Sequence, residues 1–360
     1  MKLLYTVVFI LILISNDLGD FFEPLKYFKY SGVILFLFNF NLSFGIISRS
    51  SFKLNSPLFP FLILIVINVL RMDSYNYFSL LDSLIYFLSI LPFITSKKVQ
   101  PNYKFIILSL ILIFIIKFGT SFKLDLSLES FLLSETSSAE TNTLPFLFGL
   151  FSIFFLIEKK YVFFLISIIM VFFSFKRIVF LSVVISLLFY TLNIHQKKNI
   201  RLFLLLANFA WIAISFFIAS DIFWDFSIEY TGLPPGQFTQ GRSTRYAAVI
   251  ELFEYNFIWN IIFGLGPGQV RTILEGFHFG DALQLHNDVL KVFLDYGFLI
   301  FFFFLLFFYS NKIKIIFVFS LFLNLILLTD NVLIYSPVLI LYFSFIYKFI
   351  DSYEKSRYLG

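Results

Sequence analysis

Long apolar runs constrain the fold of this chain more than any other feature of its sequence. A bilayer core of about 30 Å requires roughly 20 predominantly apolar residues in each spanning helix. About twelve runs approach this length, at 2–15, 30–47, 57–70, 77–94, 103–119, 144–157, 161–175, 178–193, 202–219, 288–309, 315–329 and 332–349. The pattern predicts an all-α polytopic membrane protein with about 12 transmembrane helices.

Composition supports this prediction and removes several function classes. Of the 360 residues, 59% are hydrophobic and only 14% are charged, whereas a soluble domain is roughly one quarter charged. The absence of cysteine excludes disulfides, thiolate metal sites and a cysteine nucleophile. With only three histidines we expect no zinc site built from histidine. We expect no cofactor, and since the basic residues behind the net charge of +5 are scattered in short groups we expect no nucleic acid partner.

The basic residues predict which ends of the spans face the cytoplasm. If both termini are cytoplasmic, the inner segments carry more Lys and Arg than the short outer loops, as the positive-inside rule requires. The inner set is Lys2, Arg49, Lys53, Lys97, Lys98, Lys104, Lys159, Lys160, Lys197, Lys198, Arg201, Lys312, Lys314, Lys348, Lys355 and Arg357.

The first apolar run has two interpretations. Lys2 followed by an apolar stretch is typical of a secretory signal peptide, but no small-residue cleavage site follows it. We therefore favour a retained first helix over 2–15.

One connection is much longer than the others and divides the chain into three parts. Residues 1–219 hold nine predicted spans, 220–287 form a long extracytoplasmic loop, and 288–360 hold three spans and a cytoplasmic tail. Loops of such length are usually functional or disordered. Apolar residues at helical spacing from Ser243 to Phe263 predict an amphipathic helix at the membrane interface.

The long loop contains a pair of arginines, Arg242 and Arg245, three residues apart on one predicted helix face. Guanidinium groups bind phosphate and diphosphate through paired hydrogen bonds. The alternative is that both arginines reach lipid headgroups at the start of the helix. Arg271, in the same loop, is a further candidate for substrate binding.

Four other residues, in two places, are candidates for chemistry. His286 stands at the membrane re-entry beside Asn287, and because imidazole titrates near neutral pH it could accept a proton from a sugar hydroxyl. The amide of Asn287 could orient either the imidazole or the substrate. The alternative is a histidine that only caps the next helix. Lys176 and Arg177 interrupt apolar sequence on the same outer side, which marks either a functional site or an ordinary short loop with two solvated charges.

The run Gly264-Leu265-Gly266-Pro267-Gly268 resembles a phosphate-binding loop only superficially. No strand precedes it and proline interrupts it, so it indicates a tight turn at the end of the interfacial helix. No Walker motif, DxD pair, HExxH or GxSxG occurs in the sequence.

In order and spacing these features resemble the O-antigen ligase and polymerase superfamily. The resemblance rests on Phe263 to Gly268, then Leu285-His286-Asn287-Asp288-Val289-Leu290, then Asp295-Tyr296-Gly297-Phe298-Leu299. Gly241-Arg242 resembles the loop arginine of the family, and Ser174-Phe175-Lys176-Arg177 its arginine between two mid-chain spans. The motif-bearing part covers about 241–300, with topological agreement elsewhere.

This resemblance implies a fold like the membrane glycosyltransferase C type in the bacterial inner membrane, with a periplasmic active site. It implies undecaprenyl-diphosphate-linked glycans as substrates, no metal, and a possible chain-length-regulating membrane protein as partner. Arg177 and Arg242 would bind the donor diphosphate and His286 would activate the acceptor hydroxyl. Arg245 is the alternative to Arg242 at the same family position, and Lys176 departs from the small residue common there.

Three functions remain open at this point. The first is a Wzy-type O-antigen polymerase, which moves a growing glycan onto a lipid-linked repeat unit. The second is an O-antigen ligase, which moves the glycan to a lipid A core. The third is a polysaccharide flippase or transporter, which charged residues along a central membrane path would favour.

Overall fold

The computed structural model describes residues 2–18, 56–71, 77–95, 100–119, 143–174, 176–196, 199–232, 234–239, 241–277, 284–311 and 313–358. Within these ranges the regular elements are helices and no strand occurs, which confirms the all-α prediction. The α-helices are α1 (Lys2–Leu18), α3 (Phe59–Leu70), α4 (Tyr77–Thr95), α5 (Tyr103–Phe118), α7 (Leu144–Ile157), α8 (Tyr161–Phe173), α9 (Arg177–Thr191), α10 (Ile200–Ala219), α11 (Asp221–Thr231), α12 (Pro235–Phe238), α13 (Arg242–Glu254), α14 (Phe257–Phe263), α15 (Gln269–Gly276), α16 (Asp288–Phe308), α17 (Lys314–Leu327) and α18 (Ser336–Tyr358).

Helix α7 lies at the centre of the bundle. Every residue from Leu144 to Phe155 is buried, as expected for a helix that is apolar on all sides. It contacts α5, α8, α9, α17 and α18. Aromatic side chains fill much of this contact, and the rings of Phe154 and Phe345 stack with centroids 4.1 Å apart.

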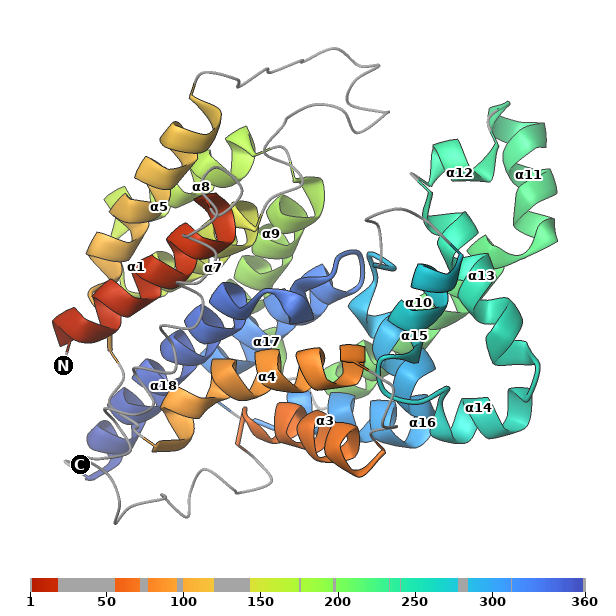
Figure 1. Cartoon of the computed structure of the whole chain (residues 1–360). Helices are drawn as coiled ribbons and strands as arrows, with labels where there is room; N and C mark the ends of the chain where they lie inside the picture. Colours follow the sequence, from red (N-terminus) through yellow and green to blue (C-terminus); the bar gives the residue numbers. More distant parts are fainter. Residues whose placement is uncertain are drawn as a thin grey trace.

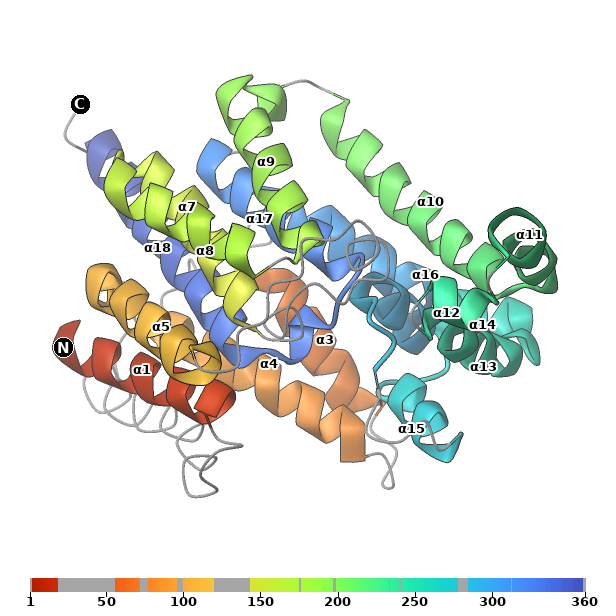
Figure 2. The same cartoon turned by 90° about the horizontal axis from the view of Figure 1, so that it is seen from above.

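The two termini lie at one end of the molecule and α11–α15 at the other (Figures 1 and 2). Helix α1 packs on α5 and also contacts α18. Its Thr6 hydroxyl accepts the backbone N–H of Asn102 at 2.7 Å, and the carboxylate of Asp17 accepts the hydroxyl of Thr143 at 2.8 Å. The first apolar run is therefore packed against the core in this structure.

The apolar runs within the described ranges form helices, but most of these are shorter than a bilayer-spanning segment. Only α10, with 20 residues, and α16, with 21, are both long and apolar enough by length and composition to cross a membrane. The shorter apolar helices include α3, α7, α8, α9 and α17. The predicted span 30–47 lies outside the described residues. The count of about twelve spans stays a prediction.

The long loop forms a group of helices, and the single helix predicted from Ser243 to Phe263 is wrong. The chain leaves the helical conformation at Asn256, which separates α13 from α14. The side-chain amide of Asn260 donates to the carbonyl of Phe253 at 2.7 Å and so satisfies a group at the end of α13. Helix α13 contacts α10 and buries Phe253, whereas α14 exposes Trp259 and other apolar side chains.

The glycine segment after α14 packs against a kink in α16 rather than forming a ligand loop. Leu265 and Gly266 donate backbone N–H groups to the carbonyls of Leu294 and Asp295, at 2.8 and 3.0 Å. Helix α16 is interrupted at Gly297, whose φ is 76°. The backbones of Gly264 and Gly297 lie so close that a Cβ on either would fall 2.5 Å from the other segment. The predicted tight turn is confirmed, and the close backbone contact explains these glycines.

We expect Gly264→Ala to destabilise the protein by about 3 kcal/mol or more, because a Cβ would meet the Asp295 carbonyl and because φ is 73° there. Thermal unfolding of the purified protein measures the effect. Gly276→Ala is the matched control, since a Cβ at Gly276 meets no atom within 4 Å. Equal stability of the two variants would contradict the packing described above.

Candidate active site

His286 lies in the short segment between the long loop and α16, in a backbone conformation that is rare for histidine. Its φ is 55°, in the left-handed region, and such outliers persist where surrounding contacts enforce them. Here the side-chain oxygen of Asn331 accepts the backbone N–H of His286 at 3.0 Å. The imidazole remains accessible, with 39% of the side chain exposed. Contacts therefore fix the backbone of His286, while its imidazole ring stays accessible to a ligand.

A buried carboxylate stands beside the imidazole. Asp330 lies 3.8 Å from His286, measured from Oδ1 to Nδ1, and 2.5 Å from the ammonium of Lys176, measured from Oδ2. Burial opposes ionisation of Asp330, but the contact with His286 and the charge of Lys176 overcome it and hold the carboxyl pKa below its usual range. The carboxylate therefore stabilises the fold above the unfolded pKa of about 3.9, and this contribution is lost as the pH falls below it.

The side-chain amide of Asn331 also lies against the imidazole of His286. Its oxygen accepts the backbone N–H of His286, and its amide nitrogen lies 3.3 Å from Nδ1. The amide can donate to Nδ1 only in the tautomer that bears its hydrogen on Nε2. Action as a base through Nε2 requires the other tautomer. Asp330 would stabilise that tautomer once Oδ1 approached Nδ1 to hydrogen-bonding distance.

Asn287 has structural contacts on both sides of its amide. Its oxygen accepts the backbone N–H of Leu290 at 2.9 Å as the N-cap of α16, and its nitrogen donates to Ser215 of α10 at 3.0 Å. The side chain is fully buried. The predicted substrate role of Asn287 stays untested, and its contacts are those of a residue that holds α16 and α10 beside His286.

Arg242 and Arg245 lie one turn apart at the start of α13, and Arg245 reaches the His286 segment. The guanidinium of Arg245 donates to the carbonyl of Gln284 at 3.3 Å, two residues before His286. Burial, followed by the charge of Arg242, lowers the pKa of Arg245. Both side chains are half-buried. Two cations this close repel each other, and an anionic ligand bound beside them would offset that repulsion.

Lys176 and Arg177 are a second pair of cations, at the start of α9. Lys176 connects to His286 through Asp330 and lies 4.7 Å from the ring of Phe146. Both residues also line a cavity of about 570 Å³ whose walls are Val171, Phe172, Ile178, Phe180 and Leu181 of α8 and α9. The α8–α9 groove is therefore apolar along its walls and cationic at one end.

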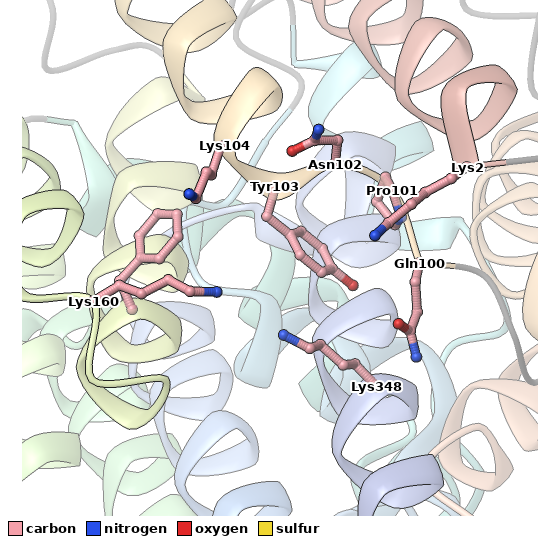
Figure 3. Close-up of a pocket in the computed structure, with 9 residues that line it drawn as sticks. Lys2, Gln100, Pro101, Asn102, Tyr103, Lys104, Lys160 and Lys348 are labelled. Carbon is pink, nitrogen blue, oxygen red and sulfur yellow. The ribbon is translucent and has the colours of Figure 1, made fainter.

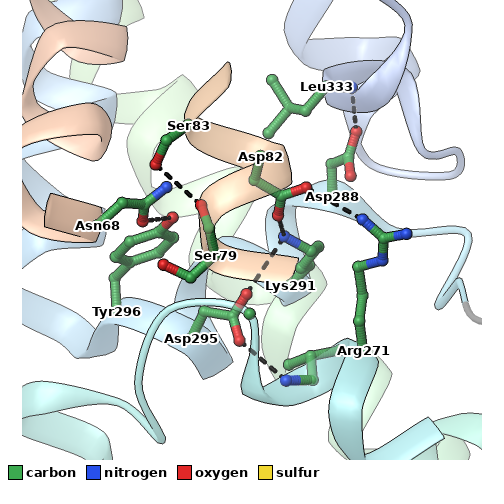
Figure 4. Close-up of polar contacts among 12 residues, drawn as sticks. Asn68, Ser79, Asp82, Ser83, Arg271, Asp288, Lys291, Asp295, Tyr296 and Leu333 are labelled. Atoms are coloured by element: carbon green, nitrogen blue, oxygen red, sulfur yellow. Dashed lines mark hydrogen bonds and ion pairs between the residues drawn. The ribbon is translucent and has the colours of Figure 1, made fainter. Parts of the chain in front are cut away.

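Arg271 belongs to a different set of contacts, the buried network of Asp82, Lys291, Asp295 and Arg271 (Figure 4). Lys291 lies 2.6 Å from Asp82 and 3.2 Å from Asp295, while Arg271 lies 3.2 Å from Asp82. The guanidinium of Arg271 also covers the ring of Phe78 at 4.3 Å. With two charges of each sign, the network is balanced and joins α4, α15 and α16. Arg271 is thus committed to a structural ion pair.

Sequence reasoning did not assign roles to Asp330, Asn331 or the buried network. Asp330 and Asn331 lie 44 and 45 residues beyond His286, so no local motif joins them. One feature of the sequence could have pointed to these residues. Asp82 and Asp330 lie within or beside predicted spans, where a charged side chain is energetically costly and therefore marks a candidate site. Within the described ranges, no three His, Asp or Glu side chains gather so that they could hold a metal ion.

Comparisons with known protein families, with curated proteins and with solved structures give no match for this chain.

Proposed function

We propose that the chain is a polytopic membrane protein of the bacterial inner membrane, with α11–α15 on the periplasmic side. The outer helices support this proposal, because α5, α8 and α10 expose large apolar side chains such as Phe105, Val162 and Phe203. A soluble bundle would cover the central α7 with amphipathic helices that present polar residues to water. Two long apolar helices, α10 and α16, add to this argument.

We further propose that the protein is a glycosyltransferase that uses a lipid-diphosphate-linked glycan, acting as an O-antigen polymerase. The observation that carries this proposal is a set of cations beside the His286 segment: Lys176 pairs with Asp330, which also faces His286, and Arg245 bonds the carbonyl of Gln284. Arg177 follows Lys176 in the chain and Arg242 lies one helical turn before Arg245, and the four residues are called the cation cluster below. A permanently positive cluster beside an accessible imidazole matches the two needs of such a transfer, a charged leaving group and a hydroxyl nucleophile.

In this reaction a hydroxyl oxygen of the acceptor sugar attacks the anomeric carbon of the donor glycan. The new glycosidic bond forms as the bond from that carbon to the diphosphate oxygen breaks, and the diphosphate leaves with the electron pair. The hydroxyl proton passes to Nε2 of His286, with Asp330 stabilising the resulting imidazolium. Arg177 and Arg242 would meet the negative charge on the departing lipid diphosphate.

The α8–α9 groove supports a lipid-linked donor in particular. Its apolar walls would accept the polyprenyl chain, while Arg177 and Lys176 at its end would hold the diphosphate. The energy for transfer lies in the donor bond itself, so a nucleotide site is not needed for this chemistry. Undecaprenyl-diphosphate-linked oligosaccharide fits this combination of apolar and cationic surfaces.

A specific observation also favours a second candidate, a polysaccharide transporter. The buried network of Asp82, Lys291, Asp295 and Arg271 places charges among apolar helices, as transporters often do. The network is closed and balanced, however, and Lys291 and Asp295 are almost fully buried. This arrangement is more typical of a network that holds helices together than of a path for ions or substrate.

Deletion of the gene, followed by gel analysis of the lipopolysaccharide, tests these functions. Loss of a polymerase leaves core with a single repeat unit, and loss of a ligase leaves core with none. A long-chain ladder that survives deletion would contradict both enzymes. Accumulation of undecaprenyl-linked repeat units on the cytoplasmic face would identify a transporter instead.

Complementation of the deletion strain extends this test to the cation cluster. We expect Arg177→Ala and Arg242→Ala each to reduce chain extension about 100-fold or more, because each removes charge stabilisation of the leaving diphosphate. Arg201→Ala is the control, since Arg201 bonds the carbonyls of Ser310 and Asn311, away from this cluster. Normal ladders from both site variants at wild-type protein levels would remove the cluster from the mechanism.

A further inference from the structure

A second cationic site lies at the end of the molecule that holds the start of α1, away from His286. Residues of α1, α5, the α7–α8 turn and α18 line a pocket of about 200 Å³ there. Lys2, Lys104, Lys160 and Lys348 all contribute to its lining, and their side chains turn toward the same space (Figure 3). Four lysines from four segments of the chain thus meet at one cavity.

Among the described residues, one carboxylate pairs with the lysines of this pocket. Glu158 pairs with Lys348 at 2.8 Å and with Lys160 at 3.1 Å. Burial opposes its ionisation, but the two lysines hold the pKa of Glu158 below its usual value. Four ammonium groups line the pocket, so within the described part of the chain the charge of the pocket is positive. Such an arrangement is favourable only with an anion close by.

The backbone at this pocket also favours an anion. Helices α5 and α8 both begin here, after Asn102 and Lys160, and neither has a side-chain cap for its first N–H groups. The positive ends of their helix dipoles therefore add to the charge of the lysines. The cavity is smaller than the roughly 300–1,000 Å³ typical of sites for drug-sized ligands. A single phosphate group suits it better than a nucleotide.

The helices that leave the pocket present apolar surface along their length. On α5, Phe105, Leu108 and Leu112 are each more than half exposed and follow one another at helical spacing. On α8, Val162 and Leu165 are similarly exposed. A ligand with a phosphate in the pocket would therefore lie beside surfaces that accept hydrocarbon chains.

We propose that this lysine pocket binds the headgroup phosphate of an anionic phospholipid, with its acyl chains against the exposed faces of α5 and α8. Basic pockets between membrane helices are a known mode of recognition for anionic headgroups. The site lies apart from the His286 segment, and its test does not depend on glycan transfer. It does share with the proposed function the location of the chain in a membrane.

The test uses the full-length protein in detergent, with bound lipid counted by native mass spectrometry. Phosphatidylglycerol and phosphatidylcholine with identical acyl chains are titrated in parallel. We expect the double variant Lys104→Gln/Lys160→Gln to retain phosphatidylglycerol about 30-fold more weakly, at about fivefold for each lysine. Retention of phosphatidylcholine should not change, and Lys104→Arg/Lys160→Arg should restore binding of phosphatidylglycerol.

The matched control is Lys117→Gln/Lys314→Gln, which removes the same charge away from the pocket. Lys117 lies in the last turn of α5 and Lys314 begins α17, where it covers Tyr190. Thermal unfolding of each variant verifies that it is folded. Equal loss of phosphatidylglycerol in control and pocket variants would overturn the proposal. It would also be overturned if inorganic phosphate bound with the same lysine dependence while phosphatidylglycerol did not.

Discussion

Replacing His286 by alanine is expected to reduce glycan chain extension by about 10²- to 10⁴-fold, the range that a positioned general acid or base contributes. The imidazole is the accessible group at the centre of the cation cluster, and Asn331 and Asp330 hold it there. The measurement is the lipopolysaccharide ladder of a deletion strain that expresses the variant. The amount of variant protein in the membrane is determined in parallel.

His195→Ala serves as the matched control for this experiment. His195 lies in a short 3₁₀ segment between α9 and α10, close to Phe317 and distant in contacts from the His286 segment. Its replacement should leave the ladder unchanged. A complete ladder from His286→Ala at normal expression would eliminate His286 from the chemistry, whatever the function of the arginines.

The same system tests Asp330 as a positioning residue. Asp330→Asn removes the charge that would stabilise the base-competent tautomer of His286 but keeps the size of the side chain. It should therefore lower the transfer rate and shift its pH profile, whereas a purely structural contribution would lower protein yield without changing that profile. An unaltered profile would indicate that Asp330 acts only through its ion pair with Lys176.

The second large effect is expected at Lys291, whose replacement by methionine should destabilise the protein by about 3–5 kcal/mol. The ammonium lies between Asp82 and Asp295, and all three side chains are buried. Without it, two carboxylates would face each other in an apolar interior. Thermal unfolding and the yield of folded protein in detergent measure the effect.

The double variant Asp82→Asn/Lys291→Met separates lost charge balance from lost packing. It leaves Arg271 and Asp295, one charge of each sign, and should be more stable than Lys291→Met alone. Lys314→Met, at the exposed start of α17, is the control for loss of a lysine and should cost little. A double variant as unstable as the single one would show that charge balance is not what the network provides.

Local features of the sequence predicted much of the fold. Apolar runs such as 161–175 and 202–219 coincide with α8 and α10 in the structure, because a long apolar segment without Gly or Pro has few ways other than a helix to satisfy its backbone. The turn at Gly264 to Gly268 was also predictable. The break at Asn256 was not, because the apolar spacing continues across it and only the contact of Asn260 with Phe253 favours two helices.

The sequence by itself determined that the chain is helical and that it is too apolar for an ordinary soluble domain. It also placed Arg242, Arg245, Arg271 and His286 in one long connection between apolar runs. Tertiary structure alone decided which charges meet. Asp82 and Lys291 are 209 positions apart, and the lysines of the second pocket come from four segments. The physical reason is that helices apolar on nearly every side, such as α7, carry no pattern that specifies their neighbours, so packing decides which polar groups pair.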